Sequence, residues 1–284
     1  MYQALYRKWR PKVFSDVIGQ EHITETLKKQ VAEGRTSHAY LFTGTRGTGK
    51  TTCAKILAKA VNCEHPVNGD PCCQCPSCIG LESGSFLDVL ELDAASNNGV
   101  DQVRALRDEA IYAPANVKKR VYIVDEVHML STAAFNALLK ILEEPPAHLM
   151  FILATTELHK VPATILSRCQ RYSFKRILPK DIARRLTYVA QQEQIDLTPD
   201  GAELLSRLAD GALRDGLSLL DQCAAAGGTV DSRAVLEVLG LAGNLQTAQL
   251  MRDILDRNAQ AALLLLNELY TGGKDVGAVL GELS

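Results

Sequence analysis

The stretch GTRGTGKT at residues 44–51 restricts the fold of this chain more than any other feature. It matches the eight-residue phosphate-binding loop pattern, and it lies between a strand-like run, AYLFTG (39–44), and a helical run, TTCAKILAKAVN (51–62). In that setting the glycines let backbone N–H groups turn toward phosphates, and the helix N-terminus adds a favourable dipole. The sequence therefore predicts a nucleotide-binding α/β domain.

Two side chains of this loop have separate expected roles. The Lys50 ammonium would reach the β- and γ-phosphates, and the Thr51 hydroxyl would be a ligand of Mg²⁺. A chance glycine-rich turn is the alternative, and the flanking strand and helix disfavour it. The residues expected to contact the nucleotide here are Gly44, Thr45, Arg46, Gly47, Thr48, Gly49, Lys50, Thr51 and Thr52.

A second acidic motif follows in VYIVDEVH (121–128), an apolar run that ends in Asp125 and Glu126. Asp125 would hold Mg²⁺ through water, and Glu126 would orient or deprotonate the attacking water. An acidic turn at a strand end is the plain alternative. After a phosphate loop, however, the carboxylate pair indicates hydrolysis of the nucleotide rather than storage.

The first half of the chain alternates strand-like and helical runs, as a parallel sheet covered by helices on both faces requires. The clearest helix, residues 131–144, has Phe135, Leu138, Leu139 and Leu142 on one face and ends before two prolines. The further candidate strands are DVLELDA (88–94), RVYIVDE (120–126), MFILATT (150–156) and RYSFKRI (171–177).

Beyond residue 178 only helical patterns remain. Thr198 is predicted to be an N-cap, with Pro199 at the first helical position. The expected organisation is a nucleotide-binding domain over residues 1–178, a small all-α domain over 179–241, and the start of a truncated helical third domain over 242–284.

Composition restricts location and partners. The 284 residues are 46% hydrophobic and 23% charged, with a net charge of −2 and no membrane-length apolar run. The N-terminus has charges but no apolar signal region, so we expect a cytoplasmic protein. Near-neutral charge argues against nucleic-acid binding by this chain alone through a strongly basic face, and leaves contact through a local patch open.

Four of the eight cysteines lie in PCCQCPSC (71–78). Cys72, Cys75 and Cys78 repeat the two-residue spacing typical of thiolates around a tetrahedral metal. Cys73 adjoins Cys72, and neighbouring side chains seldom converge on one ion. An iron–sulfur ligand run is disfavoured because no further cysteine follows closely downstream. Three good ligands are predicted, and the fourth must come from elsewhere.

The order and spacing of several motifs carry a resemblance to a known family. They are YRKWRP (6–11), DVIGQEH (16–22), the phosphate loop, DEVHMLS (125–131), LATTE (153–157) and SRC (167–169). Together they resemble the gamma/tau subunits of the bacterial DNA polymerase III clamp loader, a family of AAA+ ATPases. The resemblance implies a P-loop AAA+ sheet domain with a zinc-binding insertion, a helical lid and the start of an oligomerisation (collar) domain.

Further nucleotide contacts are implied by this resemblance alone. Thr156 matches the sensor-1 residue that contacts the γ-phosphate, and its neighbour Thr155 is the second choice. Val17 and Ile18 match the segment that packs against adenine.

The resemblance also gives roles to two arginines. Arg168 matches the arginine finger that reaches a neighbouring subunit's ATP, and Arg214 matches the sensor-2 arginine of the lid, which acts in cis. By sequence alone each is an ordinary exposed arginine.

In the family pattern, Cys63 completes a zinc site with Cys72, Cys75 and Cys78. His65 is a chemical rival for the fourth position. A closed four-thiolate site is structural, and it would fold an insertion, roughly residues 63–84, that has little apolar sequence of its own. Cys73 stays outside this pattern.

DNA contact is less visible in the sequence. Arg104 and Arg107 lie on a helix whose family counterpart lines a duplex channel, where they would meet phosphates without reading sequence. A solvated helix face is the alternative. The run Lys118-Lys119-Arg120 is interpreted as a solvated turn.

The expected function is that of an ATP-hydrolysing subunit of a DNA polymerase holoenzyme that loads the sliding clamp on primed DNA. The implied cofactors are ATP or ADP, Mg²⁺ and Zn²⁺. The implied partners are other clamp-loader subunits in a hetero-oligomeric ring, the clamp and primer–template DNA. Two alternatives are a scaffold subunit that binds but does not hydrolyse ATP, and an AAA+ motor acting on DNA junctions, which would lack the zinc insertion.

Overall fold

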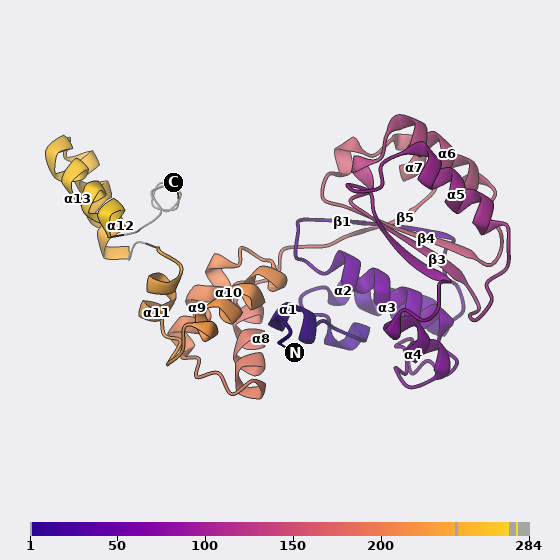
Figure 1. The fold of residues 1–284 in the computed structure, drawn as a ribbon, viewed down its shortest axis with the longest axis horizontal. Helices are drawn as coiled ribbons and strands as arrows, with labels where there is room; N and C mark the ends of the chain where they lie inside the picture. Colours follow the sequence, from indigo (N-terminus) through magenta and orange to yellow (C-terminus); the bar gives the residue numbers. More distant parts are fainter. Residues whose placement is uncertain (1, 242–243, 273–276, 278–284) are drawn as a thin grey trace. The chain divides into compact units, whose positions relative to one another are not determined.

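The computed structural model describes residues 2–241, 244–272 and 277 (Figure 1). They form two compact units. The sheet unit consists of Trp9–Leu178 with Gly211–Leu213, and the helical unit consists of the described residues of Met1–Lys8, Pro179–Asp210 and Arg214–Ser284. Residues up to Lys8 thus group with the helical unit, although the sequence placed them in the first domain. The division into three domains stays a prediction.

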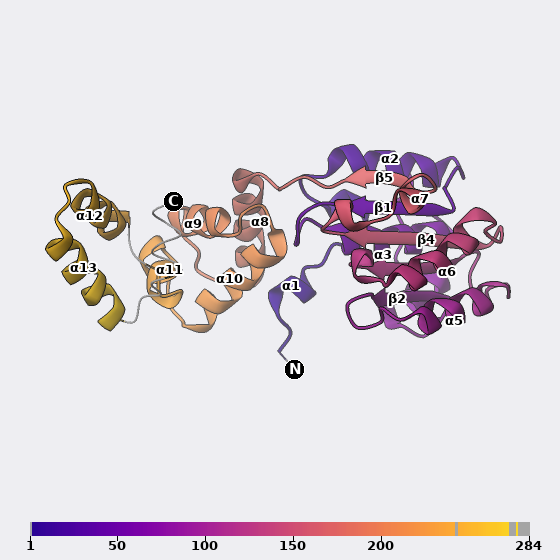
Figure 2. The same ribbon diagram turned by 90° about the horizontal axis from the view of Figure 1, so that it is seen from above.

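The sheet unit contains five parallel strands in the order β2-β3-β4-β1-β5, with β2 and β5 at the two edges (Figure 2). The predicted α/β class with a parallel sheet is confirmed. Four of the predicted strands agree with the structure to within one residue at each end. The strands are β1 (Ala39–Thr43), β2 (Val89–Asp93), β3 (Arg120–Asp125), β4 (Leu149–Thr155) and β5 (Gln170–Ser173).

The fifth strand is shorter than predicted, because it ends at Ser173 rather than at residue 177. Its neighbour β1 stops at Thr43, whose carbonyl accepts the amide of Phe174 at 2.7 Å. The backbone of Lys175 is bonded instead to the side chain of Gln20, at 3.1 Å through its amide and 2.7 Å through its carbonyl. A buried glutamine thus replaces the sheet partner.

Helices cover both faces of the sheet (Figure 1). The side chains of β4 alternate between two cores: Phe151 and Leu153 face one, while Met150 and Ile152 face the other. This alternation explains why the strand reads as one continuous apolar run. The first core includes α5 (Val100–Ala110), α6 (Thr132–Glu143) and α7 (Ala163–Leu166), and the second includes α2 (Glu21–Ala32) and α3 (Lys50–Asn62).

Short elements complete the sheet unit. A cysteine-containing segment with the helix α4 (Pro76–Ser83) connects α3 to β2. Three 3-10 turns flank the expected site: η1 (Phe14–Asp16), η2 (Val127–Met129) and η3 (Leu158–Lys160).

The helical unit has no strand among its described residues. The predicted N-cap is confirmed, since the Thr198 hydroxyl accepts the amide of Gly201 at 3.3 Å. Leu250 and Leu269 form a small separate core between the last two helices. The helices are α1 (Leu5–Lys8), α8 (Pro179–Gln192), α9 (Pro199–Leu208), α10 (Leu213–Ala225, beginning in the sheet unit), α11 (Ser232–Val238), α12 (Asn244–Leu255) and α13 (Ala259–Thr271). In the described part of the chain, no helix has the length and apolar character needed to cross a membrane.

Candidate nucleotide site and metal centre

The phosphate loop joins β1 to α3, and its backbone changes direction at glycines with positive φ. The φ angles of Gly44, Gly47 and Gly49 are +141°, +76° and +104°. A Cβ on Gly44 would lie 2.5 Å from the carbonyl oxygen of Phe174, and one on Gly47 would lie 2.5 Å from the Cβ of Ala212. The loop therefore has a backbone path and close neighbours that favour glycine. It leads directly into the N-terminus of α3, which suits an anion.

Lys50 is buried inside this loop. Its Nζ donates to the carbonyl oxygens of Gly44 and Thr45, both at 2.8 Å. Burial lowers the pKa of Lys50, while the carboxylates of Glu126 and Asp125 act in the opposite direction. The predicted phosphate-binding cation and the predicted acidic pair therefore share one electrostatic environment.

The remaining loop residues differ in exposure. Thr48 is buried, and its hydroxyl donates to the carbonyl of Thr45 at 2.8 Å. The Arg46 side chain is exposed. Thr52, in the first turn of α3, accepts a hydrogen bond from Nε of Arg10 at 3.2 Å. Thr48 thus stabilises the turn, and Arg10 adds a second cation beside the first turn of α3.

The two predicted magnesium ligands are in direct contact. The Thr51 hydroxyl donates to Oδ2 of Asp125 at 2.8 Å, although the two residues belong to α3 and β3. A hydroxyl and a carboxylate side by side are hard oxygen donors, the kind that Mg²⁺ prefers. The donor set therefore fits Mg²⁺.

Glu126 and Thr156 come together at the ends of neighbouring strands. Oε2 of Glu126 accepts the amide of Thr156 at 3.1 Å and its hydroxyl at 2.9 Å. Thr156 is one residue past the end of β4, whereas Thr155 is fully buried in that strand. Of the two threonines, Thr156 is the one bonded to the predicted water-activating carboxylate. Its sensor role stays a prediction.

His128 is a member of this cluster that the sequence did not predict. Its Nδ1 lies 3.0 Å from the Thr155 hydroxyl and 3.3 Å from Oε2 of Glu126, and its Nε2 lies 3.3 Å from Oε1 of Glu157. The side chain is almost fully buried. In the sequence, only its position two residues after Glu126 could have indicated His128. Its other two partners, Thr155 and Glu157, lie at the end of a different strand, β4.

The predicted adenine-contacting segment lies beside the phosphate loop. Val17 is buried in the core that contains α3, and its Cγ1 lies 3.9 Å from where a Cβ on Gly49 would be. Ile18 is partly exposed. Gln20, which is fully buried, donates to the carbonyl of Thr48 at 3.3 Å. The segment is thus attached to the loop, and its contact with a base stays a prediction.

Arg168 is engaged within its own chain. Its guanidinium donates to Glu143 at 2.7 Å, to the carbonyl of Thr164 at 2.8 Å and to the Ser167 hydroxyl at 3.2 Å. One third of the side chain is exposed, at 33%. An arginine acting on a neighbouring subunit would have to exchange the Glu143 contact for the new one.

Of the other predicted basic residues, Arg104 and Arg214 are exposed and Arg107 is half-buried. Arg214, in the helical unit, has its guanidinium carbon 4.9 Å from the ring centre of Tyr6, within cation–π range. On α5, Arg104 pairs with the nearby Asp101, and Arg107 pairs with its neighbour along the chain, Asp108. No role in nucleotide or DNA contact follows from these pairs.

Four cysteines form a compact sulfur cluster. The Sγ atoms of Cys63, Cys72, Cys75 and Cys78 all lie within 4.8 Å of one another. In a tetrahedral zinc site with Zn–S bonds of about 2.3 Å, the sulfurs are about 3.8 Å apart. The donor set therefore fits zinc, and among the described residues neither Cys73 nor His65 joins the group. Cys73 instead has φ of +57° and directs its Sγ toward the carbonyl of Lys12, 3.8 Å away.

The thiols of this cluster differ in acidity. Backbone amides of Gln74 and Cys75 donate to Sγ of Cys72 and lower the pKa of that thiol to about 6. Burial raises the pKa of the Cys63 and Cys78 thiols. Cys72 is thus available as a thiolate at neutral pH, and a metal would have to displace protons from Cys63 and Cys78.

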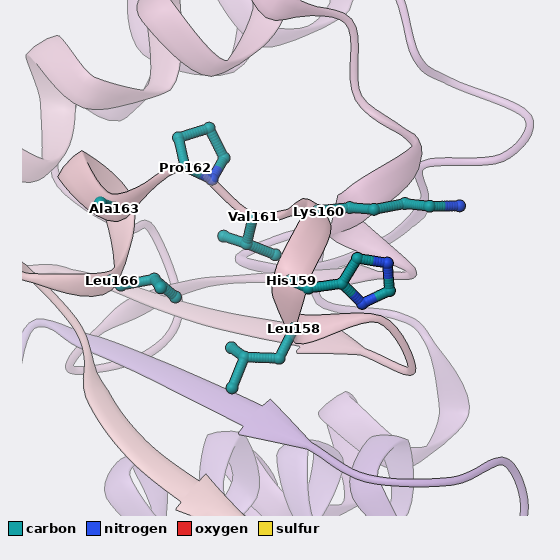
Figure 3. A pocket seen from close by; sticks show the side chains of 7 residues that line it. All are labelled: Leu158, His159, Lys160, Val161, Pro162, Ala163 and Leu166. Atoms are coloured by element: carbon teal, nitrogen blue, oxygen red, sulfur yellow. The ribbon is translucent and has the colours of Figure 1, made fainter.

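A separate hollow lies on the surface near η3 and α7, as Figure 3 shows. It contains none of the predicted nucleotide-contacting residues. Its lining residues are Leu158, His159, Lys160, Val161, Pro162, Ala163 and Leu166.

Two family models match the chain. A model described as DNA polymerase III, delta subunit, covers residues 19–177, and one described as DNA polymerase III clamp loader subunit, ATPase lid domain, covers residues 181–229. Curated relatives match nearly the whole chain. The tau subunits of DNA polymerase III from Bacillus subtilis and Escherichia coli are 51% and 46% identical over 99% of this chain, covering 50% and 44% of their own lengths. The gamma subunit from Buchnera aphidicola is 41% identical over 99% of this chain and 78% of its own length.

The chain thus spans about half the length of the tau subunits that it matches. Among solved structures, the Thermotoga maritima RuvB Holliday junction branch migration motor has a TM-score of 0.62 at 18% identity, covering 96% of this chain and 91% of that protein. A point variant of the same protein has a TM-score of 0.62 at 17% identity, covering 94% of this chain and 86% of that one. At such low identity the likeness concerns the fold alone.

Proposed function

The chain belongs to the family of DNA polymerase III tau and gamma clamp-loader subunits, and we propose that it is an ATP-hydrolysing member of that complex. Its cofactors would be ATP and Mg²⁺, with ADP as product. Its task would be to help place the sliding clamp on primed DNA as part of a DNA polymerase holoenzyme.

The paired contacts at the ends of β3 and β4 support hydrolysis over a purely structural role. Thr51 bonds Asp125, and Thr156 bonds Glu126, so the donors expected for a metal and for a water molecule lie on adjacent residues. A scaffold subunit that only binds ATP would still need Thr51 and Asp125 for Mg²⁺, but it has no need for the pair of Glu126 and Thr156. Glu126 would orient the attacking water and accept its proton, and Mg²⁺ supplies charge neutralisation at the phosphates when bound.

Lys50 and the loop amides would bind the phosphates, and Val17 and Ile18 would pack against the base. Thr156 would contact the γ-phosphate. Lys50 lies in the loop, and Thr156 is hydrogen-bonded to Glu126. Val17 lies beside the loop, with its Cγ1 3.9 Å from where a Cβ on Gly49 would be, and Ile18 is its neighbour in the chain.

Two arginines would complete the nucleotide site, one supplied by a neighbouring subunit and one by the chain itself. Arg168 would neutralise phosphoryl charge in a neighbouring subunit after leaving Glu143, which makes hydrolysis dependent on the assembled ring. Arg214 would contact the nucleotide of its own chain. The four-cysteine centre would hold zinc and fold the insertion.

The test is the ATPase activity of this chain with its partner subunits, with and without clamp and primed DNA. We expect little turnover by the isolated chain and stimulation by the assembly with clamp and DNA. An assembly that binds ATP tightly through this chain but hydrolyses none there would favour the scaffold alternative.

A further inference from the structure

A tight turn lies just before the cysteine cluster. Val67 and Asp70 exchange two backbone hydrogen bonds, both of 2.9 Å, across Asn68 and Gly69. The central residues have φ of +51° and +84°, the left-handed conformation that an Asn-Gly pair adopts most readily in a two-residue turn. A Cβ on Gly69 would lie 2.1 Å from the carbonyl oxygen of Lys28 in α2. The turn therefore packs directly against the backbone of α2, with no room for a side chain at residue 69.

Asp70, at the end of this turn, is bonded to the segment 14–18, whose Val17 lies beside the phosphate loop. Its Oδ1 accepts the amide of Phe14 at 2.6 Å, and its Oδ2 accepts the Ser15 hydroxyl at 2.6 Å. The Lys28 ammonium lies 3.5 Å from Oδ2 and donates to the Ser15 hydroxyl at 3.2 Å. The Asp70 side chain is only 14% exposed, so these bonds are partly shielded from water.

The segment of residues 63–84, here called the cysteine module, also contacts Lys12, just before Phe14 and Ser15. Glu82, at the end of α4, accepts Lys12 at 2.6 Å and Lys59 of α3 at 3.1 Å. Cys73 contacts the carbonyl of Lys12. Residues 12–15 are thus attached to the cysteine module at both ends, by Glu82 and Cys73 at Lys12 and by Asp70 at Phe14 and Ser15.

From this attachment the chain runs into the nucleotide site. Phe14 is fully buried and Val17 is buried in the same core, where Val17 adjoins Gly49 of the phosphate loop. Asp70 in turn lies two residues before Cys72, one of the four clustered thiols. A short path of direct contacts therefore connects the sulfur cluster to the residues proposed to pack against the base.

We propose that Asp70 is a positioning residue for nucleotide binding: it ties residues 14–18 to the metal-loaded cysteine module, so that zinc at the four thiols raises the affinity of the site for ATP. The proposal rests on the proposed function, because it takes Val17 and Ile18 as contacts of the base. The cysteine module is then a support for the base-binding segment as well as a small folded insertion.

The test compares Asp70→Asn with the wild-type full chain in its zinc-loaded form. Asparagine keeps an acceptor for the Phe14 amide, but it removes the negative charge beside Lys28 and places an NH2 group where Oδ2 accepts the Ser15 hydroxyl, so that hydrogen bond must reverse. We expect ATP affinity to fall about fivefold to tenfold, and affinity for inorganic tripolyphosphate to change less than about twofold. Amide hydrogen exchange in residues 13–18 should become faster while zinc content stays the same.

Glu64→Gln is the matched control, since Glu64 bonds Ser77 within the module, at 2.9 Å through its hydroxyl. It should leave ATP affinity and exchange in residues 13–18 unchanged. Ser15→Ala removes one of the bonds to Asp70 without altering the module, and it should weaken ATP binding in the same direction. That variant keeps the test decisive even if Asp70→Asn loses zinc.

Zinc removal provides the coupling measurement. A chelator should speed amide hydrogen exchange in residues 13–18 of the wild-type chain. It should speed that exchange little further in Asp70→Asn, because the contact of residue 70 with Phe14 and Ser15 is already weakened there. Equal, additive effects in both proteins would overturn the proposal, as would unchanged ATP affinity in Asp70→Asn and Ser15→Ala. If Lys50→Ala leaves both ATP and tripolyphosphate binding intact, the nucleotide-site assignment itself fails instead.

Discussion

Glu126 accepts both the backbone amide and the hydroxyl of Thr156 on one carboxylate oxygen, Oε2. Glu126 has φ of +48°, a conformation that few residues other than glycine adopt. Its backbone thus turns sharply out of β3, and its carboxylate is held by the first residue beyond β4. Two hydrogen bonds therefore hold the proposed water-activating group and the proposed γ-phosphate sensor together.

Replacing Thr156 with Val should separate these two groups at nearly constant shape. Because the hydroxyl bond to Glu126 is lost, we expect hydrolysis by the assembled complex to fall about tenfold to hundredfold, with a smaller loss of ATP affinity, since the same side chain is proposed to contact the γ-phosphate. Thr156→Ser keeps a hydroxyl and should retain most turnover. Wild-type turnover in the Val variant would remove Thr156 from the mechanism.

Lys50→Ala should abolish measurable ATP binding, because the variant lacks the buried cation of the phosphate loop. Equilibrium titration with ATP measures the effect. The control is Lys55→Ala in the same helix, where the lysine pairs with Glu91 outside the loop. Tight binding by the Lys50 variant, or an equal loss in both variants, would contradict the assignment.

Arg168→Ala should preserve ATP binding but abolish most hydrolysis in the assembled complex, by about a thousandfold if the finger role applies. Glu143→Gln separates this role from a structural one, since it removes only the carboxylate that Arg168 contacts within the chain. We expect that variant to hydrolyse ATP at least as fast as wild type. A matching loss in Glu143→Gln would mean that the ion pair itself matters.

Metal analysis of the purified chain should find about one zinc per molecule, without the visible absorbance of an iron–sulfur cluster. Cys63→Ser should lose the zinc, because it removes one of the four clustered thiols. Cys73→Ser should keep it, since that thiol faces the carbonyl of Lys12. Zinc retained by the first variant, or lost from the second, would show that the ligand set is different.

Zinc affinity should fall as the pH is lowered. Burial raises the pKa of Cys63 and Cys78, so both thiols hold protons at neutral pH before metal binds, and lower pH increases the competition from protons. Competition with a chelator of known proton affinity, measured over a range of pH, records the slope. A pH-independent zinc affinity would contradict thiolate ligation by these residues.

Local patterns predicted the parts of the molecule that depend on local chemistry. The phosphate loop was identifiable because its glycines, its flanking strand and its helix lie together in sequence. The central strands were identifiable because both of their faces are apolar. Asp125 and Glu126 followed from their place at a strand end, and the structure puts Asp125 against Thr51.

Features that depend on tertiary contacts could not be predicted from the sequence. The end of β5 depends on Gln20, which lies far away in the chain and takes the backbone of Lys175 from the sheet. His128 resembles any polar residue in a turn until Thr155 and Glu157 are placed around it. The bond from Asp70 to Phe14 likewise joins segments whose proximity no local pattern indicates.

The strand order has a further consequence for how such a protein can change over time. β1, β4 and β3 are neighbours in the sheet. The phosphate loop, Thr156 and Glu126 directly follow their carboxyl ends. Along the chain, however, the cysteine module and β2 intervene between β1 and β3. Insertions there can lengthen or shorten without moving the three strand ends apart, so accessory modules can be added during evolution while the proposed nucleotide site stays in place.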